Sequence, residues 1–244
     1  YEPALHAADN IMTFKLAVKT IAKRHGMHAT FMPKPKSGVS GSGMHINMSL
    51  RKDGRNIFAD ETDRFGLSQD AYYFIGGLMK HVYSMTAITN PLVNSYKRLV
   101  SGFEAPLHIA WSVTNRSPLI RIPSSFGSGT RIELRSPDSA ANPYLTIALC
   151  LAAGLYGIKN KITPPENIQK NIFHMTEEEK EQLHIKSLPT NLYDAVCAME
   201  RDAFIREILG EHISNVYIGS KKDEWNRYCK AVTEWEVDTY LDKF

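Results

Sequence analysis

Hydrophobic residues spaced three and four positions apart predict two long helices in the first part of the chain. The first helix runs from a cap at Asp9 or Asn10 to a stop at Gly26, and the second starts at Ser68 and ends before Asn90-Pro91. The apolar positions are Ile11, Phe14, Ala17, Val18, Ile21 and Ala22 in the first helix and Tyr72, Phe74, Ile75, Leu78, Met79 and Val82 in the second. Each set lies on one side of its helix, as in an amphipathic helix.

Shorter patterns between these helices predict strands. Residues 29–32 form an apolar segment that favours a strand, and the Pro- and Gly-rich residues 33–43 favour a loop. Residues 44–50 then alternate strictly between apolar and polar side chains, so a strand would place the polar ones on one face. These polar residues are His45, Asn47 and Ser49.

Residues 90–143 show little helical periodicity and are rich in Arg, Gly and Pro. Arg131, Glu133 and Arg135 alternate with apolar residues, so a strand projects them from one face, about 7 Å apart. If this face lies beside the polar face of residues 44–50, guanidinium groups and two types of metal ligand stand together, as phosphate transfer requires. An exposed antiparallel strand with alternating charges has the same pattern. The periodicity alone leaves both interpretations open.

The last hundred residues are predicted to be helical. Asn142-Pro143 begins a helix that is apolar and rich in small residues, which indicates a central packing helix. Beyond Pro164-Pro165 the pattern becomes charged and amphipathic, with helices expected near 176–183, 192–208 and 221–241. We expect residues 164–244 to form the C-terminal helical part of a single domain that spans residues 1–244.

Composition narrows the class of protein. With 244 residues, 43% hydrophobic and 23% charged, the chain matches a globular protein with a core of its own. The net charge of +3 is too mild to indicate a nucleic-acid partner, and the longest apolar run, 144–158, is too short to cross a bilayer. Three widely spaced cysteines argue against a disulfide framework or a zinc site. We therefore expect a cytoplasmic protein without nucleic-acid or membrane partners.

Three single features each allow two interpretations. The glycines of residues 38–43 can bring backbone N–H groups close to an anion, but such a loop is also an ordinary connection. His45 can be a metal ligand or a structural histidine. Residues 94–106 combine cations with Gly and Pro around one acid, which suits either a lid or a surface loop.

Taken together, however, the segments resemble glutamine synthetase over the whole chain. The matching motifs, in the order that the family has them, are Phe31-Met32-Pro33-Lys34-Pro35, Gly41-Ser42-Gly43-Met44-His45, Asn94-Ser95-Tyr96-Lys97-Arg98-Leu99-Val100, Gly102-Phe103-Glu104-Ala105-Pro106, Asn115-Arg116-Ser117, Ile120-Arg121-Ile122-Pro123, Arg131-Ile132-Glu133-Leu134-Arg135 and Ala141-Asn142-Pro143-Tyr144. Several long motifs in one order are a specific signal.

The resemblance implies the fold and the reaction. The fold would be α+β, a curved antiparallel sheet packed with helices, without the family's N-terminal β-grasp domain. The reaction would be the ATP-dependent ligation of ammonium to L-glutamate through γ-glutamyl phosphate. It implies Mg²⁺ or Mn²⁺ as cofactor and, for the full-length parent, a homo-oligomer of twelve subunits in two stacked rings.

The resemblance also assigns roles to individual residues. His45 and Glu133 would bind one divalent metal ion, and Glu104 would be the acid of a flap that closes over glutamate and accepts a proton. The residues assigned to glutamate and the transferred phosphoryl group are Gly41, Arg98, Arg116, Arg121 and Arg135. The residues assigned to the nucleotide are Tyr1, Ser49, Arg121 and Arg131, and Arg121 would also belong to the phosphate clamp. Positioned cations are needed because a carboxylate attacking a phosphate brings like charges together.

The chain departs from the family in three places. Ser40 stands where the family usually has Asn, which loosens the assignment of the substrate pocket. Phe173 replaces the tyrosine that some bacterial members adenylylate, so that modification is impossible here. Most of the family's metal-binding carboxylates precede the position of Tyr1, and we therefore expect residues 1–244 alone to be inactive.

Three alternatives stay open from the sequence. A γ-glutamyl-amine ligase could join glutamate to a polyamine with the same phosphate chemistry. A non-catalytic binding module is a second alternative, although the retention of His45, Glu104, Arg116, Glu133 and Arg135 argues against it. A nucleic-acid-binding domain is the weakest, because the arginines are dispersed among several strands.

Overall fold

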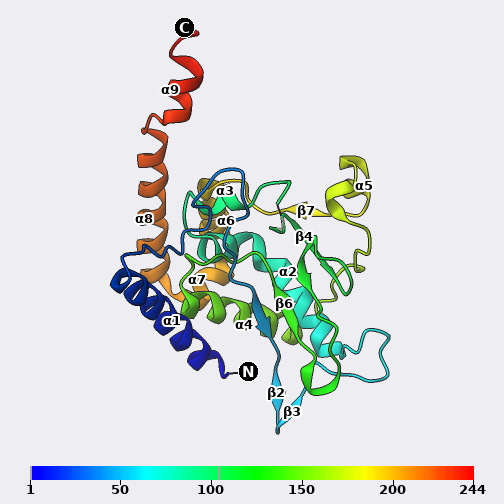
Figure 1. The fold of residues 1–244 in the computed structure, drawn as a ribbon. Helices are drawn as coiled ribbons and strands as arrows, with labels where there is room; N and C mark the ends of the chain where they lie inside the picture. The colour runs from blue at the N-terminus through cyan, green and yellow to red at the C-terminus, as the bar shows by residue number, and fades with distance from the viewer. Residues whose placement is uncertain (1, 104) are drawn as a thin grey trace.

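The computed structural model describes residues 2–103 and 105–244 and combines one five-stranded sheet with helices (Figure 1). The helices are α1 (Ala4–Arg24), α2 (Gln69–Thr89), α3 (Ser95–Arg98), α4 (Pro143–Lys159), α5 (Glu177–Gln182), α6 (Leu192–Arg201), α7 (Ala203–Leu209), α8 (Glu211–Cys229) and α9 (Glu234–Tyr240), with 3-10 turns at Gly127–Gly129 and Ile172–His174. The strands are β1 (Ile46–Met48), β2 (Arg51–Lys52), β3 (Arg55–Asn56), β4 (His108–Ser112), β5 (Pro118–Arg121), β6 (Ile132–Leu134) and β7 (Lys186–Ser187).

The sheet brings together strands that are far apart in the sequence. Its order is β1-β6-β5-β4-β7, while β2 and β3 form a separate hairpin. The register pairs Asn47 with Glu133 and Arg121 with Glu133, so three polar residues lie side by side across β1, β6 and β5. The α+β class is confirmed. The sheet is mixed, because β4 and β5 pair in parallel while the other pairings are antiparallel.

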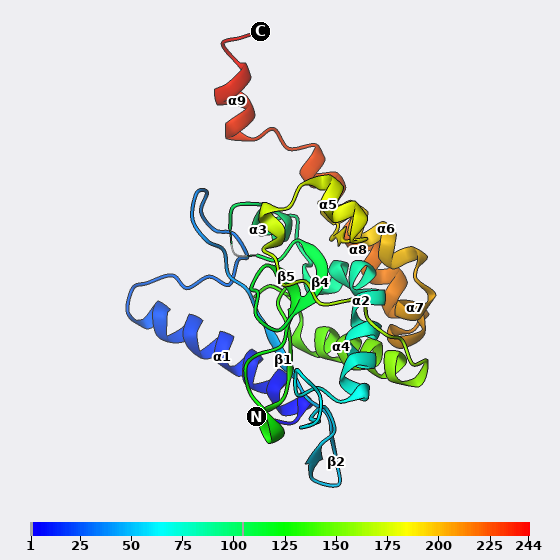
Figure 2. The ribbon, with the colours of Figure 1, turned by 90° about the vertical axis from the view of Figure 1, so that its right-hand side faces the viewer.

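Helices α2 and α4 form the centre of the helical layer (Figures 1 and 2). Glycines let their backbones touch: a Cβ atom on Gly77 would lie 2.0 Å from the carbonyl oxygen of Ala153, and one on Gly157 would lie 2.1 Å from that of Tyr73. The predicted packing role of residues 143–159 is confirmed. The buried side chains of α2, including Phe74, join this contact to the sheet through one hydrophobic core.

The helix starts show where a capping residue in the sequence correctly predicts the start of a helix. Ser68 caps α2, because its hydroxyl accepts the N–H of Ala71 at 3.2 Å. Asn142 caps α4 in the same way, through its side-chain oxygen and the N–H of Tyr144. The first helix starts earlier than predicted, at Ala4, and no side chain caps it. Asp9 and Asn10 therefore lie inside α1.

Several predicted element bounds are wrong. Residues 29–32 form no strand, because this segment is held by the side chain of Ser139, whose hydroxyl donates to the Phe31 carbonyl at 2.7 Å. The predicted helix 192–208 is broken at Asp202, whose carboxylate caps α7 through the N–H of Phe204. The helix predicted at 221–241 is interrupted as well, because α8 ends at Cys229 and Thr233 caps α9.

The C-terminal arm, defined as residues 230–244 beyond α8, projects from the rest of the molecule (Figures 1 and 2). Its exposed apolar side chains are Val232, Trp235, Val237, Tyr240, Leu241 and Phe244. Among the described residues, no helix combines the length and the apolar character that a membrane crossing requires.

Candidate active site

Strands β1 and β6 place the predicted polar residues on one face. The antiparallel register sets Ile46 opposite Leu134 and Asn47 opposite Glu133. His45 Nδ1 lies 3.0 Å from Glu133 Oε1. At the other end of β6, the Nε–H of Arg131 donates to Asn47 Oδ1 at 3.1 Å. The two polar faces thus meet as the sequence suggested, and the alternative of an isolated exposed strand is wrong.

Glu133 lies at the centre of this face and is only 6% exposed. One carboxylate oxygen contacts His45, and the other lies 2.7 Å from Nε of Arg121 on β5. Burial lowers the pKa of His45 below its ordinary value of 6.5, against the opposing effect of its hydrogen bond with Glu133. A neutral imidazole, the form that binds metals, is therefore favoured at neutral pH.

The pair His45 and Glu133 fits part of a site for a divalent cation. Two donor atoms that each lie about 2.1 Å from an octahedral ion, at right angles, are about 3 Å apart. The observed separation of Nδ1 and Oε1, 3.0 Å, is that of their hydrogen bond and is also compatible with this geometry. No group of three or more His, Cys, Asp or Glu in the described part of the chain could hold an ion. The pair could therefore supply two ligands, and water and phosphate oxygens are the usual others for Mg²⁺.

Next to this pair is a cavity of about 120 Å³, several times the space that one water needs. It is lined by Ser40, Gly41, Gly43, His45, Arg98, Phe103, Ala105 and Arg135. The structure thus places four predicted site residues, Gly41, His45, Arg98 and Arg135, around one hollow. Ser40, where the chain departs from the family pattern, lies in the same wall.

Arg98 and Arg135 are each only 4% exposed, and main-chain carbonyls hold their guanidinium groups. Arg98 donates from Nη1 to the carbonyl of Ser136 at 2.7 Å and from Nη2 to that of Arg135 at 3.3 Å. Arg135 donates from Nη1 to the carbonyl of Arg116. Because main-chain carbonyls hold both guanidinium groups, their donors are fixed before any ligand arrives.

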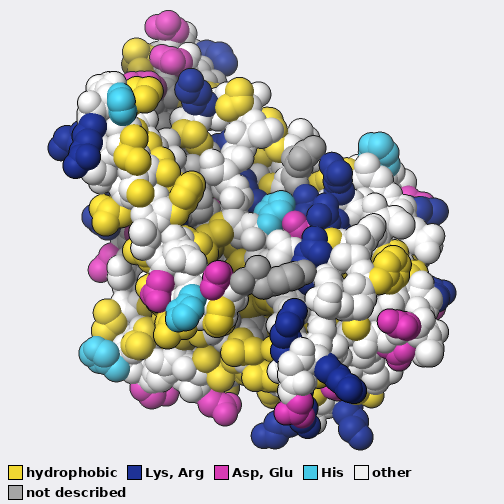
Figure 3. Space-filling model, turned by 60° about the horizontal axis from the view of Figure 1, so that its bottom comes forward, with side chains coloured by type: hydrophobic (Ala, Val, Ile, Leu, Met, Phe, Trp, Pro, Cys, Tyr) yellow, Lys and Arg dark blue, Asp and Glu magenta, His cyan; other side chains and the backbone are white. Residues whose placement is uncertain are grey.

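The charges of this cavity favour an anion. Burial lowers the pKa of Arg98 below its ordinary value; Asp138 opposes this shift, and the nearby positive charge of Arg135 adds to it. Two guanidinium groups in one largely buried wall repel each other and have lost much of their hydration. A carboxylate or phosphate ligand relieves this repulsion and can accept charge-assisted hydrogen bonds. In Figure 3, Lys and Arg side chains gather around a His and an acidic side chain at a hollow in the surface.

The glycines of the 33–43 loop allow it to approach Arg98 closely. A Cβ atom on Gly41 would lie 2.4 Å from the carbonyl oxygen of Pro33, and one on Gly43 would lie 2.6 Å from Nη2 of Arg98. The loop is also tied to the segment before α3, because the side chain of Asn94 bonds both the N–H and the carbonyl of Lys34, at 2.8 and 3.0 Å. The glycines thus shape the cavity wall, which an ordinary surface connection would not require.

The remaining predicted residues lie around this centre or outside the described residues. Arg116 is exposed, and its carbonyl, rather than its guanidinium group, is used to hold Arg135. Arg131 donates to the hydroxyl of Ser125 at 2.8 Å, and Ser49 is half-buried directly after β1. Tyr1 and Glu104 lie outside the residues that the structure describes, so their predicted roles stay predictions.

The sequence reasoning missed a buried polar group behind the cavity, formed by Asn90, Ser95, Ser136 and Asp138. Asn90 was assigned only to the end of a helix, and Ser136 and Asp138 follow β6 without a pattern of their own. The signals in the sequence were the position of Ser136 and Asp138 just after the Arg131–Arg135 motif and the position of Ser95 inside the motif of residues 94–100. Their contacts to one another depend on the tertiary fold.

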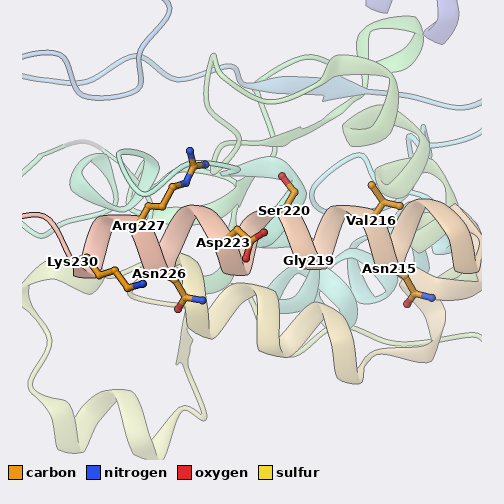
Figure 4. A pocket seen from close by; sticks show the side chains of 8 residues that line it. All are labelled: Asn215, Val216, Gly219, Ser220, Asp223, Asn226, Arg227 and Lys230. Atoms are coloured by element: carbon orange, nitrogen blue, oxygen red, sulfur yellow. The ribbon is translucent and has the colours of Figure 1, made fainter.

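A larger depression, of about 730 Å³, lies along α8 and away from this chemistry. Its lining residues all belong to α8 or to Lys230 just after it, and they lie along one side of the helix (Figure 4). A surface formed by one helix offers no converging groups. The smaller cavity at Arg98 is therefore the better candidate site, since charged groups from several segments meet there.

Comparisons with known proteins identify the family and the fold. Residues 1–240 match the family model described as glutamine synthetase, catalytic domain. The structure is similar to the solved GmaS/ADP complex, with a TM-score of 0.89 and 41% identity over 99% of this chain and 56% of that one. GmaS without ligand gives a TM-score of 0.84 at 40% identity.

The sequence relatives carry the same family name. A glutamine synthetase from Clostridium saccharobutylicum is 55% identical over all 244 residues, which span 55% of that protein. One from Methanosarcina mazei is 56% identical over 97% of this chain and 53% of its own length. The chain thus spans about half the length of the relatives it matches. With a family model that covers nearly every residue and a polar site built from its motifs, the chain belongs to the glutamine synthetase family, in the catalytic domain.

Proposed function

We propose that the complete protein is an ATP-dependent ligase that joins ammonium to L-glutamate through γ-glutamyl phosphate. The observation that carries the proposal is the pair of buried guanidinium groups, Arg98 and Arg135, in one cavity wall with His45 and next to Glu133. The family match supports the reaction, and the ADP of the solved GmaS complex supports a nucleotide substrate.

The proposed role of Arg98 and Arg135 is to bind a carboxylate of glutamate. Their guanidinium groups are fixed by main-chain carbonyls and are largely removed from water, so a carboxylate gains charge-assisted hydrogen bonds without reorganising the protein. Gly41 lets the loop backbone lie against the Arg98 side chain and line the same cavity. The small volume, about 120 Å³, suits an amino acid better than a larger ligand.

Phosphoryl transfer would take place beside Glu133. Arg121 is only partly exposed and lies against this carboxylate, while the guanidinium group of Arg116 is exposed and can move toward a phosphate. Both cations would offset the negative charge that builds up when the glutamate carboxylate attacks ATP. His45 and Glu133 would hold a divalent ion there, and this ion would supply positive charge next to the phosphate. We expect Mg²⁺ or Mn²⁺ there.

Three further roles rest on the family resemblance. Arg131 and Ser49 would contact the nucleotide. Both residues lie at the end of the β1–β6 pair that is away from His45, and this position supports a shared role. Tyr1 would stack on adenine, and Glu104 would accept a proton from ammonium while its segment excludes water from the acyl phosphate.

We also propose that the complete protein is a homo-oligomer, in which the C-terminal arm contacts another subunit. Trp235 and Leu241 are 64% and 72% exposed on an arm that packs on little else in this chain. Large apolar side chains left exposed together are typical of an association surface.

The proposal is tested on the complete gene product by measuring ADP and glutamine formed from ATP, glutamate and ammonium with Mg²⁺. We expect Arg121→Gln to lower kcat about a hundredfold, as the loss of one charge-stabilising donor does. Arg201→Gln, on the exposed side of α6, is the matched control and should change kcat less than about twofold. Polyamines and simple alkylamines are tested in place of ammonium, and a preference for one of them would replace ammonium as the substrate. A wild-type protein that forms no ADP in response to glutamate would refute the proposal.

A further inference from the structure

A buried carboxylate, that of Asp138 in the segment that follows β6, lies behind the cavity. Asp138, Asn90 and Ser95 are each 0% exposed. Asp138 Oδ2 accepts from Nδ2 of Asn90 at 3.1 Å, and its Oδ1 accepts from the N–H of Ala140 at 2.9 Å. Ser95, which belongs to the same short helix as Arg98, lies close enough to Asp138 to oppose the rise in the pKa of this carboxyl group.

This carboxylate is connected to the hydrogen bonds that hold Arg98. The side chain of Asn90 donates to Asp138 and also to the carbonyl of Ser136, at 2.9 Å. That same carbonyl accepts Nη1 of Arg98 at 2.7 Å. Asp138 thus lies beside Ser95, in the helix that carries Arg98, and holds through Asn90 the carbonyl to which Arg98 is bonded. None of these three groups lines the cavity itself.

The charges of the two groups are also complementary. Burial works against the charged forms of both side chains: it lowers the pKa of Arg98 and raises the pKa of Asp138. Each group opposes the shift of the other through electrostatic attraction. Removing one member of such a pair leaves the other charge buried without compensation.

We propose that Asp138 is a positioning residue for the carboxylate substrate: together with Asn90 and Ser95 it fixes the guanidinium group of Arg98 at the cavity wall. The inference rests on the proposed function, since it assigns to Arg98 the binding of glutamate. Asp138 acts through Arg98 and does not touch the substrate.

The first test measures steady-state kinetics of Asp138→Asn in the complete gene product. The shape of the side chain is kept and its charge is lost, so Arg98 loses its partner and shifts. We expect the KM for glutamate to rise about tenfold or more, while the KM for ATP changes less than about twofold. Asp202→Asn is the matched control, because Asp202 is also a hydrogen-bonded carboxylate, bound by His81 and Ser84, but takes no part in the hydrogen bonds that hold Arg98.

Two results would overturn the inference: a KM for glutamate that Asp138→Asn leaves within about twofold, or an equal rise in Asp202→Asn, which would indicate general destabilisation. If Asp138→Asn does not yield folded protein, Asn90→Ala takes its place, because it keeps the charge of Asp138 and removes the link to the Ser136 carbonyl. The same rise in KM is expected, and an unchanged KM again overturns the inference.

A thermal-unfolding cycle with Arg98→Met tests the coupling without any activity. We expect Asp138→Asn, or Asn90→Ala in its place, to lower Tm by about 4 °C more beside Arg98 than in the Arg98→Met background. Equal losses in both backgrounds would show that Asp138 and Arg98 are independent. If the wild-type protein lacks glutamate-dependent ADP formation, the proposed function fails, and this cycle alone decides whether Asp138 holds Arg98 in place.

Discussion

The substitution Gly43→Ala tests whether the geometry at Arg98 matters, because it adds one methyl group to the cavity wall. The added Cβ atom would lie 2.6 Å from Nη2 of Arg98 and 3.2 Å from Nε2 of His45. Ordinary contact starts near 3.4 Å, so the guanidinium group must retreat by about 0.8 Å. No positive φ is involved at Gly43, and the effect is therefore steric alone.

Arg98 cannot retreat without loss, because its two hydrogen bonds already measure 2.7 and 3.3 Å. A shift of this size stretches or breaks the longer one, and a misplacement of about 1 Å at a substrate-binding group costs about a hundredfold in rate. We expect kcat/KM for glutamate to fall about a hundredfold, equivalent to about 2.7 kcal/mol of transition-state stabilisation.

The assay is glutamate-dependent ADP formation by the complete gene product, with circular dichroism to verify folding. Gly219→Ala is the matched control, because Gly219 lies in α8 and a Cβ atom added there would meet no other atom within 4 Å. That control should keep full activity and gain up to about 1 kcal/mol of stability, since alanine favours a helix. A folded Gly43→Ala variant with kcat/KM within about threefold of the wild type would refute the steric reasoning.

Two further predictions concern the stability of the fold. Gly157→Ala would place a Cβ atom 2.1 Å from the carbonyl oxygen of Tyr73, so α2 and α4 must separate. We expect the free energy of unfolding to fall by about 3 kcal/mol and Tm to fall by about 6–12 °C. An unchanged melting curve would contradict this expectation. Asp202 is partly buried, which raises its pKa, but its bonds with Ser84 and His81 outweigh burial and hold the pKa below 3.8. Its contribution to the stability of the fold is therefore present above about pH 4 and disappears as the pH falls further. When Tm is measured between pH 6 and pH 3, it should fall less steeply with decreasing pH in Asp202→Asn than in the wild type.

Much of the local structure could be predicted from the sequence, because the signals were local. Ser68 and Asn142 mark helix starts with side chains that bond the backbone only a few residues away. The same reasoning failed where a distant group decides the conformation. Residues 29–32 look like a strand, but the Phe31 carbonyl is bonded by Ser139, which is far along the chain.

The candidate site likewise has some features that the local sequence predicts and others that depend on contacts between distant segments. The alternation of polar residues in 44–50 and 131–135 determined that His45 and Glu133 each lie on a polar strand face, because side chains of a strand alternate with a period of two. The motif pattern, compared with the family, named the arginines. The sequence could not show that Asp138 compensates the buried charge of Arg98, or that Gly43 must lack a side chain to admit its guanidinium group.

The sequence by itself thus determined which residues carry charge, where most helices begin, and which strand faces are polar, since these depend on neighbours a few positions away. Tertiary structure decided which of the charges are buried, which carbonyls hold the guanidinium groups, and which glycines are sterically required. Those properties depend on contacts between segments tens of residues apart, and only the packed sheet and helices bring these segments together.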